Sequence, residues 1–191
     1  MWLVLAADQR LQLSKALLVP CDSHGLQLLI KDVLGIPHYK VIQSQIILVI
    51  NTFCRSPLQL SILSEKQNAC YGKTSALVLA VITCWGTQAR GIESIYKNEE
   101  AFKAYVLDDH TQLDHKVSQV LCSRDFWNNI EELCDIILPI HKVQVQSEFT
   151  NAHLGLIVSR WLTIRDYLEL IVDLQPARPE ILQLFKKRIG R

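Results

Sequence analysis

Apolar residues recur at helical spacing along most of this chain, in segments separated by glycine, proline or polar breaks. Residues three and four positions apart share one face of a helix, so each segment can bury a stripe of side chains. The pattern predicts a mainly α-helical bundle with at most one or two short strands. Helices are expected over residues 23–35, 38–53, 57–70, 125–146, 154–172 and 180–189, with one interrupted helix or two short ones over 92–107.

Capping residues and one internal proline predict where some of these helices begin or end. Asp22 or Ser23 suits the N-cap of the first helix. Ser56 suits the N-cap of the third, where Gln59 would complete a capping box. Pro139 lacks a backbone N–H, so it is expected to kink or break the helix over 125–146.

One segment departs from the helical pattern. Residues 76–83 form a short continuous apolar run, which favours a buried strand or extended segment, with a short helix as the alternative. Residues 108–116 are polar and are expected to form a surface loop.

Composition fits a globular protein without a strong electrostatic field. Hydrophobic residues make up 49% of the 191 residues and charged residues 20%, enough to build a core. The formal net charge is +1, so no global basic field attracts nucleic acid or an acidic membrane. One dense basic cluster near the C-terminus is either a frayed, solvated tail or a phosphate-contacting patch; its members are Lys186, Lys187, Arg188 and Arg191.

The cysteines indicate an intracellular protein with reduced, mostly buried thiols. All six are scattered, without a C-x-x-C pair, and the apolar start of the chain is too short for a secretory signal. No stretch approaches the roughly 18 apolar residues of a membrane span.

Few residue patterns could support chemistry. Cys21 and His24, two residues apart at a helix start, could share a metal ion, but a structural zinc site needs four ligands; the alternative is a packed Cys21 beside a hydrogen-bonded His24. Adjacent acids point in different directions on a helix, and no phosphate-cradling glycine loop is present. Trp85, Trp127 and Trp161 are expected to pack in the core; the alternative, stacking on DNA bases, is suggested only by Arg160, Trp161 and Arg165 on one helix.

Three stretches resemble motifs of the hAT-family transposases and the transposase-like domain often called DUF659. Residues 20–32 read P-C-D-S-H-G-L-Q-L-L-I-K-D, similar to the family's C-x-x-H-x-L-N-L-L-x-x-D, with Gln27 where Asn is usual. Residues 83–87 read T-C-W-G-T, similar to T-R-W-x-S, so Cys84 and Trp85 form a degenerate R-W motif. The F-W and L-P-I of residues 126–140 resemble a third motif, and the resemblance runs from about residue 19 to about 174.

This resemblance implies a fold and an ancestral activity. The family has a ribonuclease-H-like core interrupted by an all-helical insertion domain, and three acidic residues there hold divalent metal for DNA strand transfer. The chain would then comprise a remnant of that core over residues 1–35 and a helical insertion-like domain over 36–191. Asp8 is the only acid before Cys21 and lacks the family's surrounding pattern, so we expect the chain to start after two of the acids and stop before the third.

The expected function follows from these departures. The leading hypothesis is a degenerate transposase-derived protein with no strand-transfer activity, no catalytic or metal-binding residue and no cofactor, unless an acidic triad supplies a divalent metal site. DNA and protein are the candidate partners; a membrane and a small-molecule substrate are not expected, and the location would be nuclear. One alternative is an active metal-dependent transposase or nuclease that uses Asp8, Asp22 and a downstream glutamate; another is a domesticated DNA-binding or scaffold protein.

Overall fold

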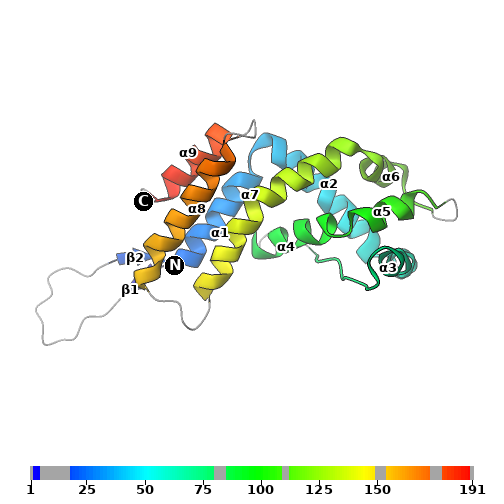
Figure 1. Cartoon of the computed structure of the whole chain (residues 1–191), viewed down its shortest axis with the longest axis horizontal. Helices are drawn as coiled ribbons and strands as arrows, with labels where there is room; N and C mark the ends of the chain where they lie inside the picture. The colour runs from blue at the N-terminus through cyan, green and yellow to red at the C-terminus, as the bar shows by residue number, and fades with distance from the viewer. Residues whose placement is uncertain are drawn as a thin grey trace, which may run out of the picture. The chain divides into compact units, whose positions relative to one another are not determined.

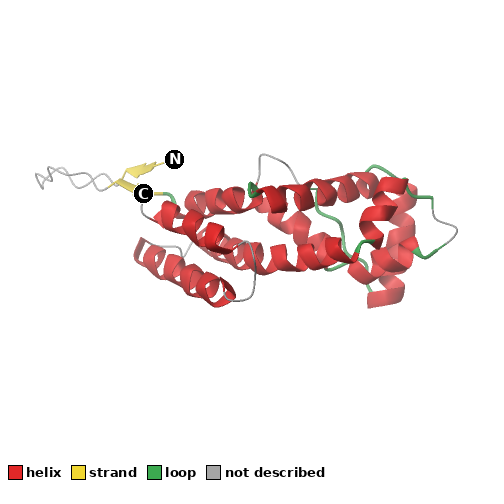
Figure 2. Ribbon diagram, turned by 90° about the horizontal axis from the view of Figure 1, so that it is seen from above, coloured by secondary structure: helices red, strands yellow, loops and turns green. Residues whose placement is uncertain are grey.

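The computed structural model describes residues 2–4, 18–79, 85–108, 112–148, 154–172 and 178–189, with the backbone alone for 2–4, 18–20, 85, 154, 172 and 178. The described chain is mainly helical, as expected (Figure 2). The elements in order are β1 (Trp2–Val4), β2 (Leu18–Pro20), α1 (Asp22–Leu34), α2 (Pro37–Cys54), α3 (Pro57–Tyr71), α4 (Trp85–Tyr96), α5 (Glu99–Val106), α6 (His115–Cys122), α7 (Arg124–Glu148), the 3-10 turn η1 (Leu154–Leu156), α8 (Ile157–Val172) and α9 (Arg178–Ile189) (Figure 1).

The chain divides into two compact units, which are described separately. The first contains residues 1–29 and 140–191, and the second contains residues 30–139. The helices α1 and α7 each contribute one end to each unit. The origin of residues 1–35 as a remnant of a ribonuclease-H-like core stays a prediction.

In the first unit, α9 packs against α8. The same unit contains the start of α1 and the end of α7. Its two short strands pair antiparallel, with Leu3 opposite Val19. Trp161 of α8 and Phe185 of α9 are buried, and their ring centroids lie 5.6 Å apart. Other buried apolar residues of this unit are Leu26, Leu29, Ile140, Val143, Ile164, Leu168 and Ile181.

The second unit is built around α2, which contacts α3, α4 and α6, while α3 packs against α5. An aromatic cluster lies in its core. The ring of Phe53 meets those of Phe102 and Tyr105 edge to face, with centroids 5.1 and 5.0 Å apart. Phe126 and Trp127 extend the cluster from the start of α7. Edge-to-face pairs add to the stabilisation that comes from burial.

The boundary between α1 and α2 follows from a glycine and a proline. The Gly35 N–H bonds back to the carbonyls of Lys31 and Asp32, and Pro37 then opens α2. Within the described residues, no single helix has the length and apolar composition to cross a membrane. Only α1 and α2 taken together meet that test, on length and composition alone, and the chain bends by 94° between them.

Three local expectations differ from the structure, at least in part. The break expected at Pro139 is absent, because α7 runs as one helix from Arg124 to Glu148 with the proline inside it. Ser56 does accept a hydrogen bond from the Gln59 N–H, but the Gln59 side chain donates to the Gln112 carbonyl instead of completing the box. Residues 76–79 are the described part of the stretch expected as a buried strand or extended segment; they form no strand, none of them is buried, and Leu79 is exposed, while residues 80–83 lie outside the described residues.

The helix α6 was missed. Its N-cap residue, Asp114, accepts a hydrogen bond from the Lys116 N–H at 2.8 Å. The last two residues of the expected surface loop, His115 and Lys116, therefore begin a helix, while residues 108 and 112–114 are non-helical as expected. Only Val117 and Leu121 of α6 are fully buried. Two apolar positions in eight residues are too few to reveal a helical period.

Candidate functional site

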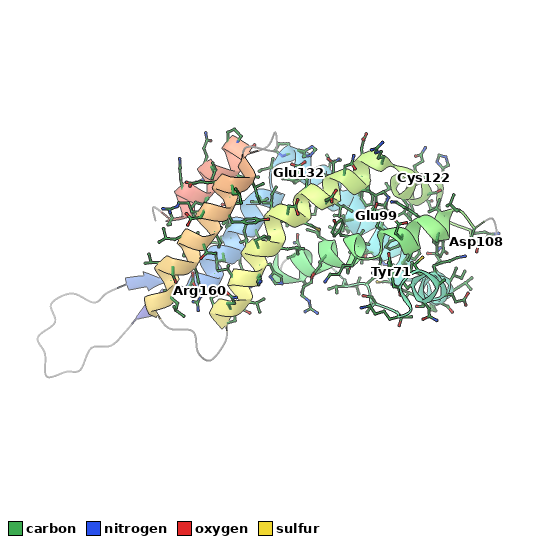
Figure 3. The ribbon with its side chains drawn as sticks, in the orientation of Figure 1. Tyr71, Glu99, Asp108, Cys122, Glu132 and Arg160 are labelled. Carbon is green, nitrogen blue, oxygen red and sulfur yellow. The ribbon has the colours of Figure 1, made fainter. Side chains whose placement is uncertain are left out.

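The start of α1, which carries the C-x-x-H stretch, is held by a buried ion pair. Asp22 Oδ2 accepts a hydrogen bond from Arg160 Nη1 at 3.0 Å, and Asp22 Oδ1 accepts one from Trp161 Nε1 at 2.8 Å. The two charged side chains are 8% and 10% exposed, respectively (Arg160 is labelled in Figure 3). Both carboxylate oxygens are therefore engaged by α8, far away in the sequence, and the expected capping role of Asp22 gives way to this tertiary contact.

A glycine allows this close packing of α1 against α8. A Cβ placed on Gly25 would lie 3.0 Å from Cζ2 of Trp161. That separation is shorter than ordinary van der Waals contact, so a larger side chain would push the indole away from Asp22. The glycine inside the motif is thus explained by its contact with Trp161.

The next residue of the motif also makes a tertiary contact. Ser23 Oγ donates to Glu148 Oε1 at 2.6 Å, and Gln144 Nε2 donates to the same oxygen at 2.9 Å. These two hydrogen bonds, with that from Ser23 the larger cause, lower the pKa of the Glu148 carboxyl below its ordinary value. The folded protein therefore keeps Glu148 ionised, and Ser23 joins α1 to the end of α7.

The residues singled out from the sequence have different placements. Cys21 is half-buried just before α1, and its carbonyl accepts the Gly25 N–H at 2.9 Å, while His24 is exposed on the first turn. Cys84 lies outside the described residues, and so does the side chain of Trp85, the first residue of α4. Within the part of the chain that the structure describes, no three His, Cys, Asp or Glu side chains gather closely enough to hold a metal ion.

Trp161 of α8 packs in the core as expected, and the alternative of a base-stacking surface is wrong for this residue. Trp161 is 8% exposed, and its indole N–H is bound by Asp22. A base could stack only on an exposed ring face, so Trp161 serves packing. Arg160 is likewise held by Asp22. Of the two arginines in this group, only Arg165 therefore has an exposed side chain.

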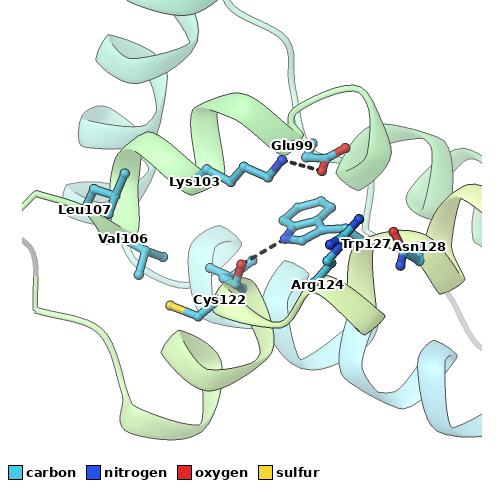
Figure 4. Close-up of a pocket in the computed structure, with 9 residues that line it drawn as sticks. Glu99, Lys103, Val106, Leu107, Cys122, Arg124, Trp127 and Asn128 are labelled. Atoms are coloured by element: carbon cyan, nitrogen blue, oxygen red, sulfur yellow. Dashed lines mark hydrogen bonds and ion pairs between the residues drawn. The ribbon is translucent and has the colours of Figure 1, made fainter.

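A second candidate site is a pocket in the second unit, which the sequence did not suggest. Its volume is about 440 Å³, and it lies between the ends of α5 and α6 and the start of α7 (Figure 4). Trp127 is 5% exposed and is fixed by a 2.8 Å hydrogen bond from its Nε1 to the Leu121 carbonyl. The residues lining the pocket are Glu99, Lys103, Val106, Leu107, Leu121, Cys122, Arg124, Trp127 and Asn128.

The two cations that line this pocket differ in whether a carboxylate forms an ion pair with them. Lys103 Nζ lies 2.6 Å from a Glu99 oxygen and 3.0 Å from a Glu100 oxygen, and hydrogen bonds to these two carboxylates raise the pKa of the lysine. Arg124, the first residue of α7, is exposed. Among the described residues, no carboxylate forms an ion pair with it. The pocket therefore combines an apolar lining with one cation that is not neutralised by a described neighbour.

The comparisons with known proteins assign no relationship. No protein-family model matches the chain, and no curated protein or solved structure gives a significant match. The resemblance to hAT-family transposases therefore rests on the motif residues alone and stays a prediction.

Proposed function

We propose that the chain is a transposase-derived helical protein that acts by binding protein or DNA and does not perform strand transfer. The observation that carries this proposal is the set of hydrogen bonds that Asp22 accepts. Its two oxygens accept hydrogen bonds from Arg160 and Trp161, and the pair is almost fully buried. Asp22, which occupies a variable position of the C-x-x-H stretch, thus contributes to the packing of the first unit.

The same contact argues against the alternative of an active nuclease with Asp22 as an improvised metal ligand. A divalent cation at Asp22 would lie close to the Arg160 guanidinium, and two positive charges at short range in a poorly solvated site repel strongly. Asp22 would also have to give up hydrogen bonds to bind the ion. Asp8, the other proposed ligand, lies outside the described residues.

The basic cluster near the C-terminus favours protein over DNA as the partner. Lys186, Lys187 and Arg188 lie in the last turn of α9, so the expectation of a frayed tail is wrong for these three residues. Consecutive helical residues are turned by about 100° from one another. The three cations therefore spread around the helix and do not form the contiguous basic face that salt-dependent DNA binding requires.

The proposal is tested by incubating the full chain with duplex DNA that carries hAT-type transposon ends, in the presence of Mg²⁺ or Mn²⁺. We expect no nicks and no joined products under conditions in which a competent hAT transposase yields both. Asp22→Asn is the matched variant, because it keeps the size of the side chain and removes its charge. Metal-dependent nicking by the natural chain would overturn the proposal, and its loss in Asp22→Asn would identify Asp22 as a ligand of the metal.

A further inference from the structure

The pocket beside Trp127 has the size and lining of a ligand site. Its volume of about 440 Å³ falls within the roughly 300–1,000 Å³ of small-molecule pockets. We propose that it binds a small amphipathic carboxylate, whose apolar body lies against Trp127 and Leu107 and whose carboxylate pairs with Arg124. This inference goes beyond the proposed function and does not depend on the transposase origin of the chain.

The apolar body proposed for the ligand is inferred from apolar side chains that remain exposed to solvent after folding. Leu107 is 82% exposed although it lines a pocket, and Val106 beside it is only half-buried. Leu121 and Trp127 are buried and linked by a hydrogen bond, so they form a fixed wall. An apolar ligand would remove Leu107 from water without rearranging the wall, which favours binding.

The choice of a carboxylate rests on charge. The positive charge of Lys103 already faces the two carboxylates of Glu99 and Glu100, so this lysine has little attraction left for a second anion. Arg124 has no such carboxylate among its described neighbours, and a guanidinium can grip a carboxylate through two parallel hydrogen bonds. Arg124 is thus the lining cation that is left to bind a single negative charge.

Mostly buried thiols were expected, but among the described cysteines only Cys134 is buried. The exposed Cys122 and Cys70 provide the measurement. Cys122 lines the pocket, as Figure 4 shows, while Cys70 of α3 is exposed and is not part of the lining. The full chain is alkylated with iodoacetamide, and the rate at each cysteine is followed by peptide mass spectrometry. The probes are 4-phenylbutyrate, 4-phenylbutanol and 4-phenylbutylamine, which share an apolar body and differ in the charge of the head group.

We expect 4-phenylbutyrate to slow alkylation of Cys122 several-fold, the alcohol to slow it less and the amine least, with no change at Cys70. High salt should reduce the advantage of the acid over the alcohol, because the Arg124 contact is partly exposed. Equal protection by all three probes, equal protection at Cys70, or no protection by any probe would each overturn the inference.

The role of Arg124 is tested by Arg124→Gln, with Arg90→Gln as the matched control. Arg90 is an exposed arginine of α4 that does not line the pocket. In Arg124→Gln, the acid and the alcohol should slow alkylation of Cys122 equally. Arg90→Gln should behave like the natural chain. An advantage of the acid that survives in Arg124→Gln contradicts the proposal. Since these readouts involve neither DNA nor metal, their failure is distinct from a failure of the proposed function.

Discussion

Asp22→Ala is expected to lower the free energy of unfolding by about 3–5 kcal/mol, the usual cost of removing one partner of a buried ion pair. The substitution leaves the Arg160 guanidinium, 10% exposed, without its carboxylate. It also removes the acceptor of the Trp161 indole N–H, which lies in the same contact. Urea unfolding followed by circular dichroism measures the change.

A matched control exists on the same helix. Arg165 and Asp166 form an ion pair on α8 whose side chains are 44% and 64% exposed. Asp166→Ala should change the stability by less than about 0.5 kcal/mol, because water screens an exposed pair. The double variant Asp22→Leu with Arg160→Met should recover much of the loss, since it leaves no buried charge unpaired. A loss below about 1 kcal/mol for Asp22→Ala would contradict the structural role assigned to this pair.

Gln67→Met is expected to cost about 2–4 kcal/mol, because it leaves several polar groups of the second unit without a partner. Gln67 is 2% exposed, and its amide pairs with the Ser75 backbone as a neighbouring strand would. Its Nε2 donates to the Ser75 carbonyl at 2.7 Å, and its Oε1 accepts the Ser75 N–H at 3.1 Å. Its Nε2 also donates to Oδ1 of the buried Asn98 at 2.8 Å. Methionine keeps the volume and loses all three bonds.

The control for this prediction is the same substitution at an exposed glutamine. Gln119 lies on the surface of α6, in the same unit, so Gln119→Met should change stability by less than about 0.5 kcal/mol. Hydrogen exchange gives a local readout, because the Ser75 amide should exchange faster in Gln67→Met than in the natural chain. An unchanged rate for that amide would show that Gln67 does not hold the segment after α3.

The main helices were predictable because each buries a stripe of apolar side chains that repeats at the helical period. In α2, for example, Ile42, Ile46, Val49 and Phe53 are buried, and the sequence alone places them on one side. The irregular segment after α3 was misread because its conformation is set by Gln67 of α3 and Ser94 of α4, which bind its backbone. Contacts between side chains and a distant backbone have no local sequence signal.

The candidate sites were predictable only in part. The C-x-x-H stretch was singled out, but the partners of Asp22 lie 138 and 139 residues away, and only the fold brings them together. The Arg160-Trp161 dipeptide was noticed for a different reason, as a surface for bases. The pocket beside Trp127 is lined by α5, the end of α6 and the start of α7, and α6 was missed, so no pattern in the sequence marks it.

The most direct test of the central claim, that Asp22 serves packing and not metal binding, is a Mn²⁺ titration followed by the indole N–H signals of the full chain. Trp161 Nε1 lies 2.8 Å from the Asp22 carboxylate, so a paramagnetic ion bound there would broaden the Trp161 signal before any other. The signals of Trp161 and Trp127 can be assigned with Trp161→Phe and Trp127→Phe. We predict that the two signals keep the same relative intensity throughout the titration, whereas selective loss of the Trp161 signal at low Mn²⁺ would contradict the account.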